Sequence, residues 1–466
     1  MSTDPSPCGA IVLAAGLGTR FRSDLAKVMH RIGGRTLLRH VIEALRPLGL
    51  SQVVVVVGYQ GNDVAAEAAS AGLPGLVTVV QERQLGTGDA TAQGLRALDD
   101  AVERVLILPG DTPLLTASTL GRLLQAGASA SGALLTVEFD DPTGYGRILR
   151  DESGRVLGVV EEADASETQR GLREANAGMY LFERACLAEA LKRLAPVNAQ
   201  SELYLTDVVG ILVNEGHDLQ TAPASAEDVS GVNDRVQLAA AGALLRQRTL
   251  ERLMRGGVTV VDPATTYVDV DVSIGRDTVL LPGCLIEGQT HIGERVSLGP
   301  YTRLVDAEIQ DGATVAQSVV LGASVGPEAS VGPFTYLRPG TRLERRAKAG
   351  AFVEMKNATI GEGSKVPHLS YVGDARVGRE VNFSAGAITC NYDGFTKHET
   401  VIEDGAFVGS DNMLVAPVRI GRGAFTAAGS VITKDVPDDA LALERSEQRT
   451  IEGWAARKRA KQRQGE

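Results

Sequence analysis

The sequence predicts two folds in series, an α/β domain with a mostly parallel sheet followed by a parallel β-helix. The first expectation rests on aliphatic strands that alternate with helical segments. The second rests on an aliphatic residue that returns every six positions from Ile274 to about Val436. The composition of 53 glycines and only 4% aromatic residues suits a solenoid with many corners.

The chain opens with an aliphatic strand that enters a Gly-rich turn. Ala10 to Leu13 is followed by Gly16 and Gly18, and then by the basic residues Arg20 and Lys27. Glycines let backbone N–H groups approach a phosphate closely, and the basic side chains supply positive charge. The order matches neither the GxGxxG fingerprint nor the P-loop, so a purely structural turn is the alternative at this point.

Three further aliphatic strands are predicted at residues 53–57, 77–80 and 105–108, with a helical segment at 37–48. Such an alternation implies a sheet covered on both faces, with ligands at the carboxyl ends of its strands. Asp111 lies at such an end, where a carboxylate can hold a hard cation against phosphate oxygens. Taken alone, Asp111 would be interpreted as a helix N-cap or a turn acid.

A one-sided helical pattern follows between residues 233 and 255 and ends at Gly256 and Gly257. We interpret it as a linker helix that packs against one or both domains, with a partner-binding helix as the alternative. The predicted boundaries are 1–234 for the first domain, 235–257 for the linker helix, 258–446 for the β-helix and 447–466 for a basic tail.

In the second half, aliphatic residues hold two six-residue phases, and three hexads make one triangular coil of about eighteen residues. The first phase runs from Ile274 to Leu304 and the second from Ile402 to Ile432. Between them, residues 389–400 break the pattern and predict a loop that leaves the prism. We interpret it as a binding loop, since repeat arrays often use insertions in this way; a loop without function is the alternative.

Charge and cysteine usage exclude several classes of protein. The net charge of −11 argues against a nucleic-acid binder. The longest aliphatic block, Val53 to Val57, is too short to span a membrane, and Met1 to Pro7 does not resemble a signal peptide. Four separated cysteines without metal-ligand spacing predict a cytoplasmic location. The basic run Arg457 to Arg463 is interpreted as a solvated terminus, with contact to a ligand or a neighbouring subunit as the alternative.

Several motifs then occur in a fixed order. The first half holds Leu13 to Arg20, Leu25 to Lys27, Gln84 to Gly88, Gly110-Asp111, Pro142 to Arg147 and Gly231 to Asn233; the repeat region holds Glu354 to Lys356, His368 to Tyr371 and Thr389 to Gly394. Together they resemble the bacterial bifunctional UDP-N-acetylglucosamine pyrophosphorylase / glucosamine-1-phosphate N-acetyltransferase family over almost the entire chain. The resemblance implies an α/β Rossmann-like nucleotidyltransferase domain followed by a left-handed parallel β-helix of hexapeptide repeats.

The resemblance also implies two reactions of UDP-N-acetylglucosamine synthesis for cell-envelope polysaccharides, carried out by a homotrimer. Acetyl-CoA acetylates glucosamine-1-phosphate, and UTP then uridylylates N-acetylglucosamine-1-phosphate with release of pyrophosphate. One alternative is a single-function pyrophosphorylase whose β-helix is a non-catalytic assembly module. Another is a zinc site of the kind found in β-helical carbonic anhydrases, for which the repeat region offers only His291, His368 and His398.

For uridylyl transfer, the resemblance implies Mg²⁺ held by Asp111 and Asn233, with Arg20 and Lys27 as catalytic cations. A sugar phosphate is already an anionic nucleophile, so the reaction needs positioning and charge neutralisation rather than a protein base. The implied nucleotide and sugar contacts are Leu13, Ala14, Ala15, Gly16, Lys27, Gln81, Gly86, Thr87, Gly110, Asp111, Gly146, Glu161, Asn176 and Asn233.

For acetyl transfer, the chemistry needs a group that can take a proton from an amine near neutral pH. Histidine is the usual group, and the resemblance implies that His368 is this general base. Without the resemblance, an ordinary coil histidine is the alternative. The implied acceptor contacts are Arg338, Lys356, Tyr371 and Asn382, and the implied acetyl-CoA contacts are Ala385, Asn391, Tyr392, Ser410, Ala428 and Arg445.

The sequence departs from the family pattern at a few positions. Ala26 stands where a proline is common, which affects the shape of the loop around Lys27. Pro367 precedes His368 and is expected to stiffen the approach of the base. Phe383-Ser384 replaces a smaller pair and is expected to add bulk close to the acetyl-CoA contacts.

Overall fold

The structure is a computed structural model that describes residues 7–463. The chain divides into two compact units, residues 1–248 and 249–466, and each is described by itself. The segment of residues 1–7, for which the sequence predicts no signal peptide, lies outside the described residues except for Pro7. Across residues 7–463, none of the helices combines the length and the apolar character needed to cross a membrane.

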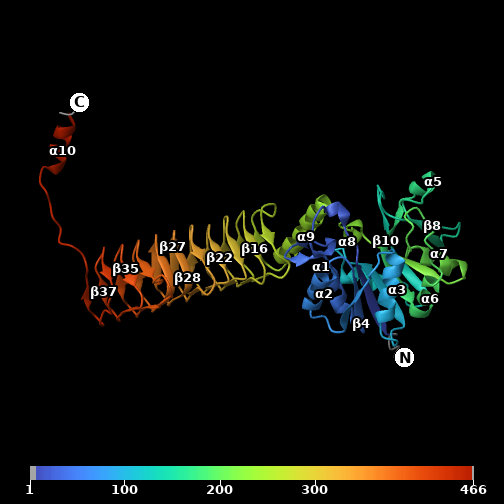
Figure 1. Cartoon of the computed structure of the whole chain (residues 1–466), viewed down its shortest axis with the longest axis horizontal. Coiled ribbons are helices and arrows are strands. Elements are labelled where there is room, and N and C mark those ends of the chain that lie inside the picture. The colour runs from blue at the N-terminus through green and yellow to red at the C-terminus, as the bar shows by residue number, and fades with distance from the viewer. Residues whose placement is uncertain (1–6, 464–466) are drawn as a thin grey trace. The chain divides into compact units, whose positions relative to one another are not determined.

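The first unit is built on one nine-stranded sheet (Figure 1). Its main path runs through β11 (Leu219–Pro223), β7 (Gly132–Glu138), β10 (Glu174–Glu183), β6 (Arg104–Pro109), β1 (Cys8–Ala14), β4 (Gln52–Val57) and β5 (Leu76–Val80), and the hairpin of β8 (Arg147–Arg150) and β9 (Val156–Val160) pairs with β10. The strands from β6 to β5 are parallel, as expected. β10 runs antiparallel to both β6 and β7, so the other half of the sheet is mixed.

Both faces of this sheet are buried, because neighbouring residues of a strand point to opposite sides. In β1, Ala10 and Val12 enter one core and Ile11 enters the other. The first core is covered by α1 (Leu37–Leu45), α2 (Gly61–Ser70), α4 (Ala117–Ala126) and α8 (Ala226–Val229), and the second by α3 (Thr87–Ala97), α6 (Arg184–Leu191) and α7 (Asp207–Asn214); α5 (Glu167–Arg170) is a single short turn. The predicted helix at 37–48 and the three predicted strands are therefore confirmed.

The helical pattern after residue 233 forms α9 (Arg235–Arg255). Within the first unit, Leu238 and Ala241 pack into a small core with Phe21. Within the second unit, Leu250 and Leu253 belong to the core of the β-helix. The two ends of α9 thus contribute apolar side chains to different cores.

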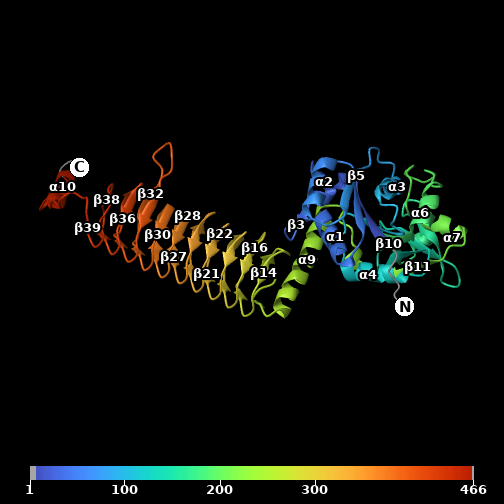
Figure 2. The same cartoon turned by 90° about the horizontal axis from the view of Figure 1, so that it is seen from below.

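The second unit is a left-handed parallel β-helix, a prism of short strands (Figure 2). Its strands run from β12 (Thr259–Val260) to β39 (Leu441–Ala442). One ladder of eleven strands forms one face, and a seventeen-stranded sheet carries the other two faces. Ser273 pairs with His291, eighteen residues on, which is one full coil.

The inward positions of the prism follow the predicted six-residue period. Leu280, Ile286 and Ile292 are buried in one continuous core, and Ile402, Val408 and Leu414 continue that core on later coils. Phe383 is also fully buried in it. The expectation that Phe383 adds bulk beside acetyl-CoA is therefore wrong, because the alternation of the strand turns this side chain into the core while Asn382 faces outward.

The predicted loop leaves the prism beside β32 (Ile388–Cys390), and Figure 2 shows it projecting from the stack of coils. Tyr392 and Lys397 form an isolated antiparallel bridge that closes this loop. In the basic tail, residues Trp454–Arg463 form α10, whose side chains are all exposed.

Candidate active sites

Four predicted side chains meet at the carboxyl ends of β1 and β6. Lys27 forms an ion pair with Asp111 and donates a hydrogen bond of 2.7 Å to Asn233 Oδ1. Arg20 donates to the same oxygen over 3.0 Å. Because the side chains of Lys27 and Asp111 are only 14% and 19% exposed, solvent screens this ion pair weakly. The structure therefore brings the predicted cations and the predicted metal ligands together.

The Gly-rich turn positions this cluster. Gly110 donates its N–H to Leu13 O over 2.9 Å, which joins the ends of the two strands. Gly18 has a φ of 62°, and a Cβ at Gly18 would lie 2.5 Å from Lys27 Cβ, so only glycine lets Lys27 pack this closely. Ala26 donates its N–H to Gln60 Oε1 over 2.7 Å, a bond that proline could not make. The departure at Ala26 thus anchors the loop that carries Lys27.

Gln81, Gly86 and Thr87 lie on the segment that joins β5 to α3. Gln81 donates its N–H to Val57 O over 2.8 Å, and its side-chain amide donates to Gly86 O over 3.2 Å. A Cβ at Gly86 would lie 2.6 Å from Leu203 O, so a side chain cannot be placed there. Thr87 Oγ1 accepts a hydrogen bond of 3.0 Å from a backbone N–H. These residues form one loop, and part of their hydrogen bonding holds that loop itself.

The residues predicted for the sugar side also meet. Asn176 donates its N–H to Gly146 O over 2.8 Å, and a Cβ at Gly146 would lie 3.4 Å from Glu161 Oε2. Thr206 Oγ1 donates to Glu161 over 2.9 Å. Burial raises the pKa of Glu161, since the carboxylate loses part of its hydration. The Asn176 amide donates to Tyr180 Oη over 2.6 Å and is fixed by that bond.

Asp111 and Asn233 fit a hard divalent cation. Their side-chain oxygens already converge on one positive charge, the ammonium group of Lys27. Such a cation is commonly held by one or two protein oxygens together with phosphates of the substrate. Within residues 7–463 no cluster of three or more His, Cys, Asp and Glu side chains could hold a metal, so the zinc site considered above is not found there.

In the prism, His368 lies at a corner between β29 (Lys365–His368) and β30 (Tyr371–Val377). Its carbonyl accepts hydrogen bonds from Ser370 Oγ at 2.7 Å and Gly386 N at 3.4 Å, while its imidazole is exposed. No hydrogen bond joins that imidazole to another side chain among the described residues. The corner thus holds the backbone and leaves the ring free to meet a substrate.

The predicted acetyl-CoA contacts form a column that starts at this corner. Ala385, Ser410 and Ala428 each precede a residue with a left-handed backbone on successive coils. The N–H after Ser410 donates to Ala385 O, and the N–H after Ala428 donates to Ser410 O. Arg445 donates to Ala428 O over 3.1 Å. Four of the six predicted contacts are therefore stacked along one edge.

The predicted acceptor contacts lie mainly on the face that begins at His368. Arg338 pairs with Glu354 at 2.9 Å, and Lys356 lies beside Gly373 on the next coil. A Cβ at Gly373 would lie 2.4 Å from Tyr371 Oη, so the tyrosine side chain folds over this glycine toward Lys356. Asn382 lies on the adjacent face, in β31 (Asn382–Phe383), and donates to a neighbouring serine hydroxyl over 3.0 Å.

Lys397 was missed at the sequence level. It lies on the projecting loop, and the proximity of its ammonium group, followed by that of Arg338, lowers the pKa of Lys356. Asp374 opposes that effect. Three cations thus gather at one end of the acceptor face. The sequence shows only that Lys397 is a basic residue in the segment that interrupts the six-residue repeat. It does not indicate which coil Lys397 approaches.

The two residues predicted on the loop differ in their availability. Asn391 is buried and donates its amide to Asp374 over 2.5 Å. Tyr392 is exposed, and its hydroxyl donates to Gly394 O over 2.7 Å. The side chain of Asn391 therefore holds the base of the loop, whereas the ring of Tyr392 is open to a ligand.

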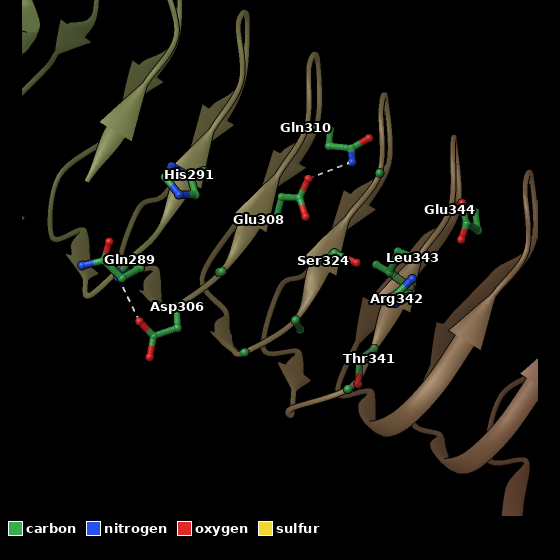
Figure 3. Close-up of a pocket in the computed structure, with 15 residues that line it drawn as sticks. Gln289, His291, Asp306, Glu308, Gln310, Ser324, Thr341, Arg342, Leu343 and Glu344 are labelled. Carbon is green, nitrogen blue, oxygen red and sulfur yellow. Dashed lines mark hydrogen bonds between the residues drawn. The ribbon is translucent and has the colours of Figure 1, made fainter. Parts of the chain in front are cut away.

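A separate hollow of about 550 Å³ lies on a polar face of the prism (Figure 3). Figure 3 shows His291, Glu308, Ser324 and Arg342 on successive coils along it. None of the residues predicted for either reaction lines this hollow. His291 is hydrogen-bonded to Ser273 Oγ at 2.7 Å and takes no part in the cluster around His368.

Comparison with known proteins identifies the class of the first unit. The model of the MobA-like NTP transferase domain matches residues 10–203, which hold most of β1, the Gly-rich turn and Asp111. This part of the chain is therefore a nucleotidyltransferase domain. The polar corner of the prism lies outside the match.

Curated relatives cover both units. The chain is 51% identical to the bifunctional protein GlmU of Streptomyces coelicolor over 97% of this chain and 95% of the relative. It is 49% identical to that of Mycobacterium sp. strain KMS, over 98% and 93%, and 48% identical to that of Corynebacterium glutamicum strain R, over 98% and 96%. The chain belongs to the GlmU family of bifunctional proteins.

Proposed function

We propose that the two units carry out the two transfers at two separate sites. The first unit transfers uridylyl from UTP to N-acetylglucosamine-1-phosphate, and the prism transfers acetyl from acetyl-CoA to glucosamine-1-phosphate. The observation that carries this proposal is the presence of two distinct cation clusters, one around Lys27 and one around Lys356. The relatives, all named as bifunctional proteins, do not favour a non-catalytic prism.

In uridylyl transfer, a phosphate oxygen of the sugar phosphate attacks the α-phosphorus of UTP, and the bond to pyrophosphate breaks. Arg20 and Lys27 neutralise charge on the phosphates, which is the main requirement of phosphoryl transfer. The turn at Leu13, Ala14, Ala15 and Gly16 approaches the nucleotide, and Gln81, Gly86 and Thr87 contact the uracil. Gly110, which directly precedes Asp111, lines the nucleotide site. The sugar is held by Gly146, Glu161, Asn176 and Asn233.

The divalent metal expected of this class is proposed to be Mg²⁺, held by Asp111 and Asn233. When bound, it would neutralise phosphate charge and align the reacting groups. The ammonium group of Lys27 lies between these two oxygens. We therefore expect Lys27 to move from Asp111 to a phosphate when substrate and metal bind.

In acetyl transfer, the amine nitrogen of glucosamine-1-phosphate attacks the acetyl carbonyl, and the carbon–sulfur bond of acetyl-CoA breaks. His368 takes the proton that the amine loses, and the sulfur leaves as CoA thiolate. Arg338, Lys356 and Lys397 hold the phosphate, and Tyr371 and Asn382 orient the sugar. Acetyl-CoA lies along Ala385, Ser410, Ala428 and Arg445, with Tyr392 of the projecting loop as a further contact and Asn391 holding the base of that loop.

We also propose a homotrimer in the cytoplasm. The corner that carries His368 exposes Leu369 and, on earlier coils, Tyr301, Phe334 and Phe352, each by 55–71% of its surface. The Phe334 and Phe352 rings stack at 5.2 Å. An exposed apolar column of this kind supports a subunit contact beside the acetyl-transfer site. The cytoplasmic location is supported by the unpaired state of all four cysteines.

The proposal is tested with His368→Ala and His291→Ala, assayed separately for CoA thiol and for pyrophosphate. His368→Ala should lower thiol release by about 10²–10⁴-fold and leave pyrophosphate release within about twofold. His291→Ala removes a second exposed prism histidine on a different face and should affect neither reaction. Full thiol release by His368→Ala would contradict the assignment of the base.

A further inference from the structure

We propose that Asp374 is a positioning residue for acetyl transfer, which clamps the projecting loop so that Lys397 stands beside Lys356. The inference rests on the proposed acetyl-transfer site. It concerns a carboxylate that does not touch the reacting atoms and acts through the loop.

The clamp spans three coils. Asn357 Nδ2 donates to Asp374 Oδ1 over 2.7 Å, and Asn391 Nδ2 donates to Asp374 Oδ2 over 2.5 Å. Each carboxylate oxygen thus takes one amide, from the coil before and from the coil after. Asn391 is only 7% exposed, so a change that removes its acceptor would leave a buried amide without a partner.

The backbone supports this ladder. Asn357 and Asp374 have φ values of 48° and 46°, a left-handed conformation that Asn and Asp tolerate better than most residues. Gly322 and Gly340, on the two preceding coils, also have positive φ, and Gly340 donates its N–H to Gly322 O over 3.1 Å. A glycine is therefore compatible with this corner, whereas the carboxylate at Asp374 provides hydrogen bonds that glycine lacks.

The clamp leads directly to the cation cluster. The loop begins at Asn391, whose carbonyl accepts the N–H of His398 over 2.8 Å. One residue further into the loop on each side, Tyr392 and Lys397 form an antiparallel bridge that closes the loop. The end of the loop that brings Lys397 to Lys356 is thus tied to the prism through Asn391 and Asp374.

The charge of Asp374 has a second effect. The side-chain hydrogen-bonding contact with Lys397 lowers the pKa of Lys356, and repulsion from the charges of Lys397 and Arg338 lowers it further. The Asp374 carboxylate is the negative group that counteracts this repulsion at Lys356, while Glu354 pairs with Arg338. Without Asp374, the loop would both lose its anchor and be pushed away from Lys356.

The test is Asp374→Gly in the full chain, with acetyl transfer followed at varied glucosamine-1-phosphate. We expect the KM for glucosamine-1-phosphate to rise about tenfold or more, with kcat within about threefold because His368 lies at the opposite corner of the face. Trypsin should cut after Lys397 faster than in the unmodified protein. The double variant N357D/D374N restores a carboxylate and both side-chain bonds, because the amide introduced at position 374 can donate to one neighbour and accept from the other. In this double variant, the KM for glucosamine-1-phosphate should return close to the value of the unmodified protein.

The matched control is Asp306→Gly. Asp306 has a φ of 48° and accepts a backbone N–H at 2.9 Å, far from the loop, so its loss should change stability alone. An unchanged KM in Asp374→Gly, or an equal rise in Asp306→Gly, would overturn the proposal. If His368→Ala is inactive in thiol release while Asp374→Gly is normal, the positioning role fails and the proposed function stands.

Discussion

The two sites solve the same problem, the binding of a phosphorylated sugar, with opposite charge arrangements. At the sheet, Lys27 is paired with Asp111 in a partly buried site. On the prism, Lys356 faces Lys397 and Arg338, and the surrounding face is open to solvent.

The difference shows how each site controls its affinity. A paired cation at the sheet carries little net charge until a substrate or a metal separates it from its carboxylate. Among the described residues, only Arg338 of the three cations on the prism has a carboxylate ion-pair partner, Glu354, so the cluster attracts a phosphate from the start, but its cations repel one another and need a loop to hold them. We expect substitutions of the cations at the sheet to act on the chemical step and substitutions of the cations on the prism to act on the KM.

The largest effect should follow from Lys27→Met. The change removes a charge from the phosphates and leaves Asp111 partly buried without its partner, so uridylyl transfer should fall by about 10²–10³-fold. Thiol release should stay within about twofold. Lys192→Met, which breaks an exposed ion pair with Glu189, serves as the control and should leave pyrophosphate release unchanged. Normal uridylyl transfer by Lys27→Met would contradict the role given to the paired cation at the sheet.

A smaller effect is expected from Gly373→Ala. The new Cβ would meet Tyr371 Oη, the end of a side chain that can move, so the fold should lose little stability. Displacement of the tyrosine should raise the KM for glucosamine-1-phosphate about tenfold, equivalent to about 1.4 kcal/mol. Steady-state kinetics of thiol release test this, with pyrophosphate release as the internal control. An unaltered KM would mean that Tyr371 does not contact the acceptor.

Lys397→Met should change the pH dependence of acceptor binding. Lys397 lowers the pKa of Lys356, so in the unmodified protein Lys356 loses its proton, and its attraction for phosphate, at a lower pH than an isolated lysine. In the variant, the KM should be about threefold higher near pH 7.5. As the pH is raised, the KM of the variant should begin to increase at a higher pH than the KM of the unmodified protein. Lys348→Met, at an exposed position of another face, should shift neither quantity.

The smallest effect should follow from Glu161→Gln in the sheet. Burial raises the pKa of Glu161, so its contribution to stability is present below the ordinary carboxyl pKa and is lost as the pH rises through the raised pKa. Glutamine avoids that loss and should stabilise the fold at pH 7 by about 0.5 kcal/mol, with less difference near pH 4. Thermal unfolding at the two pH values measures it. Equal stabilisation at both would show that burial of the charge is not the cause.

Local patterns in the sequence predicted the parts of this structure that depend on local rules. The six-residue period gave the inward residues of the prism, because each short strand places one side chain in the core. The strand and Gly-rich turn before Lys27 were predictable for the same reason. The antiparallel course of β10 depends on pairing with distant strands, and local patterning carries no information about it.

The sites divide in the same way. Asp111 could be predicted from its position at a strand end. The approach of Lys397 to Lys356 depends on how a loop closes over two coils, and the clamp at Asp374 depends on three residues that meet only when the coils stack. The burial of Phe383 follows from the alternation of side chains along its strand, which a comparison of motifs alone does not show.

The central claim, two independent sites on one chain, is tested most directly by following both products in one reaction. Asp111→Asn and His368→Ala are each given glucosamine-1-phosphate, acetyl-CoA, UTP and Mg²⁺. Asp111→Asn should release thiol at the normal rate and accumulate N-acetylglucosamine-1-phosphate with little pyrophosphate. His368→Ala should release neither product until N-acetylglucosamine-1-phosphate is added, after which pyrophosphate should appear at the normal rate. Loss of thiol release in Asp111→Asn, or no pyrophosphate from His368→Ala after that addition, would contradict the account.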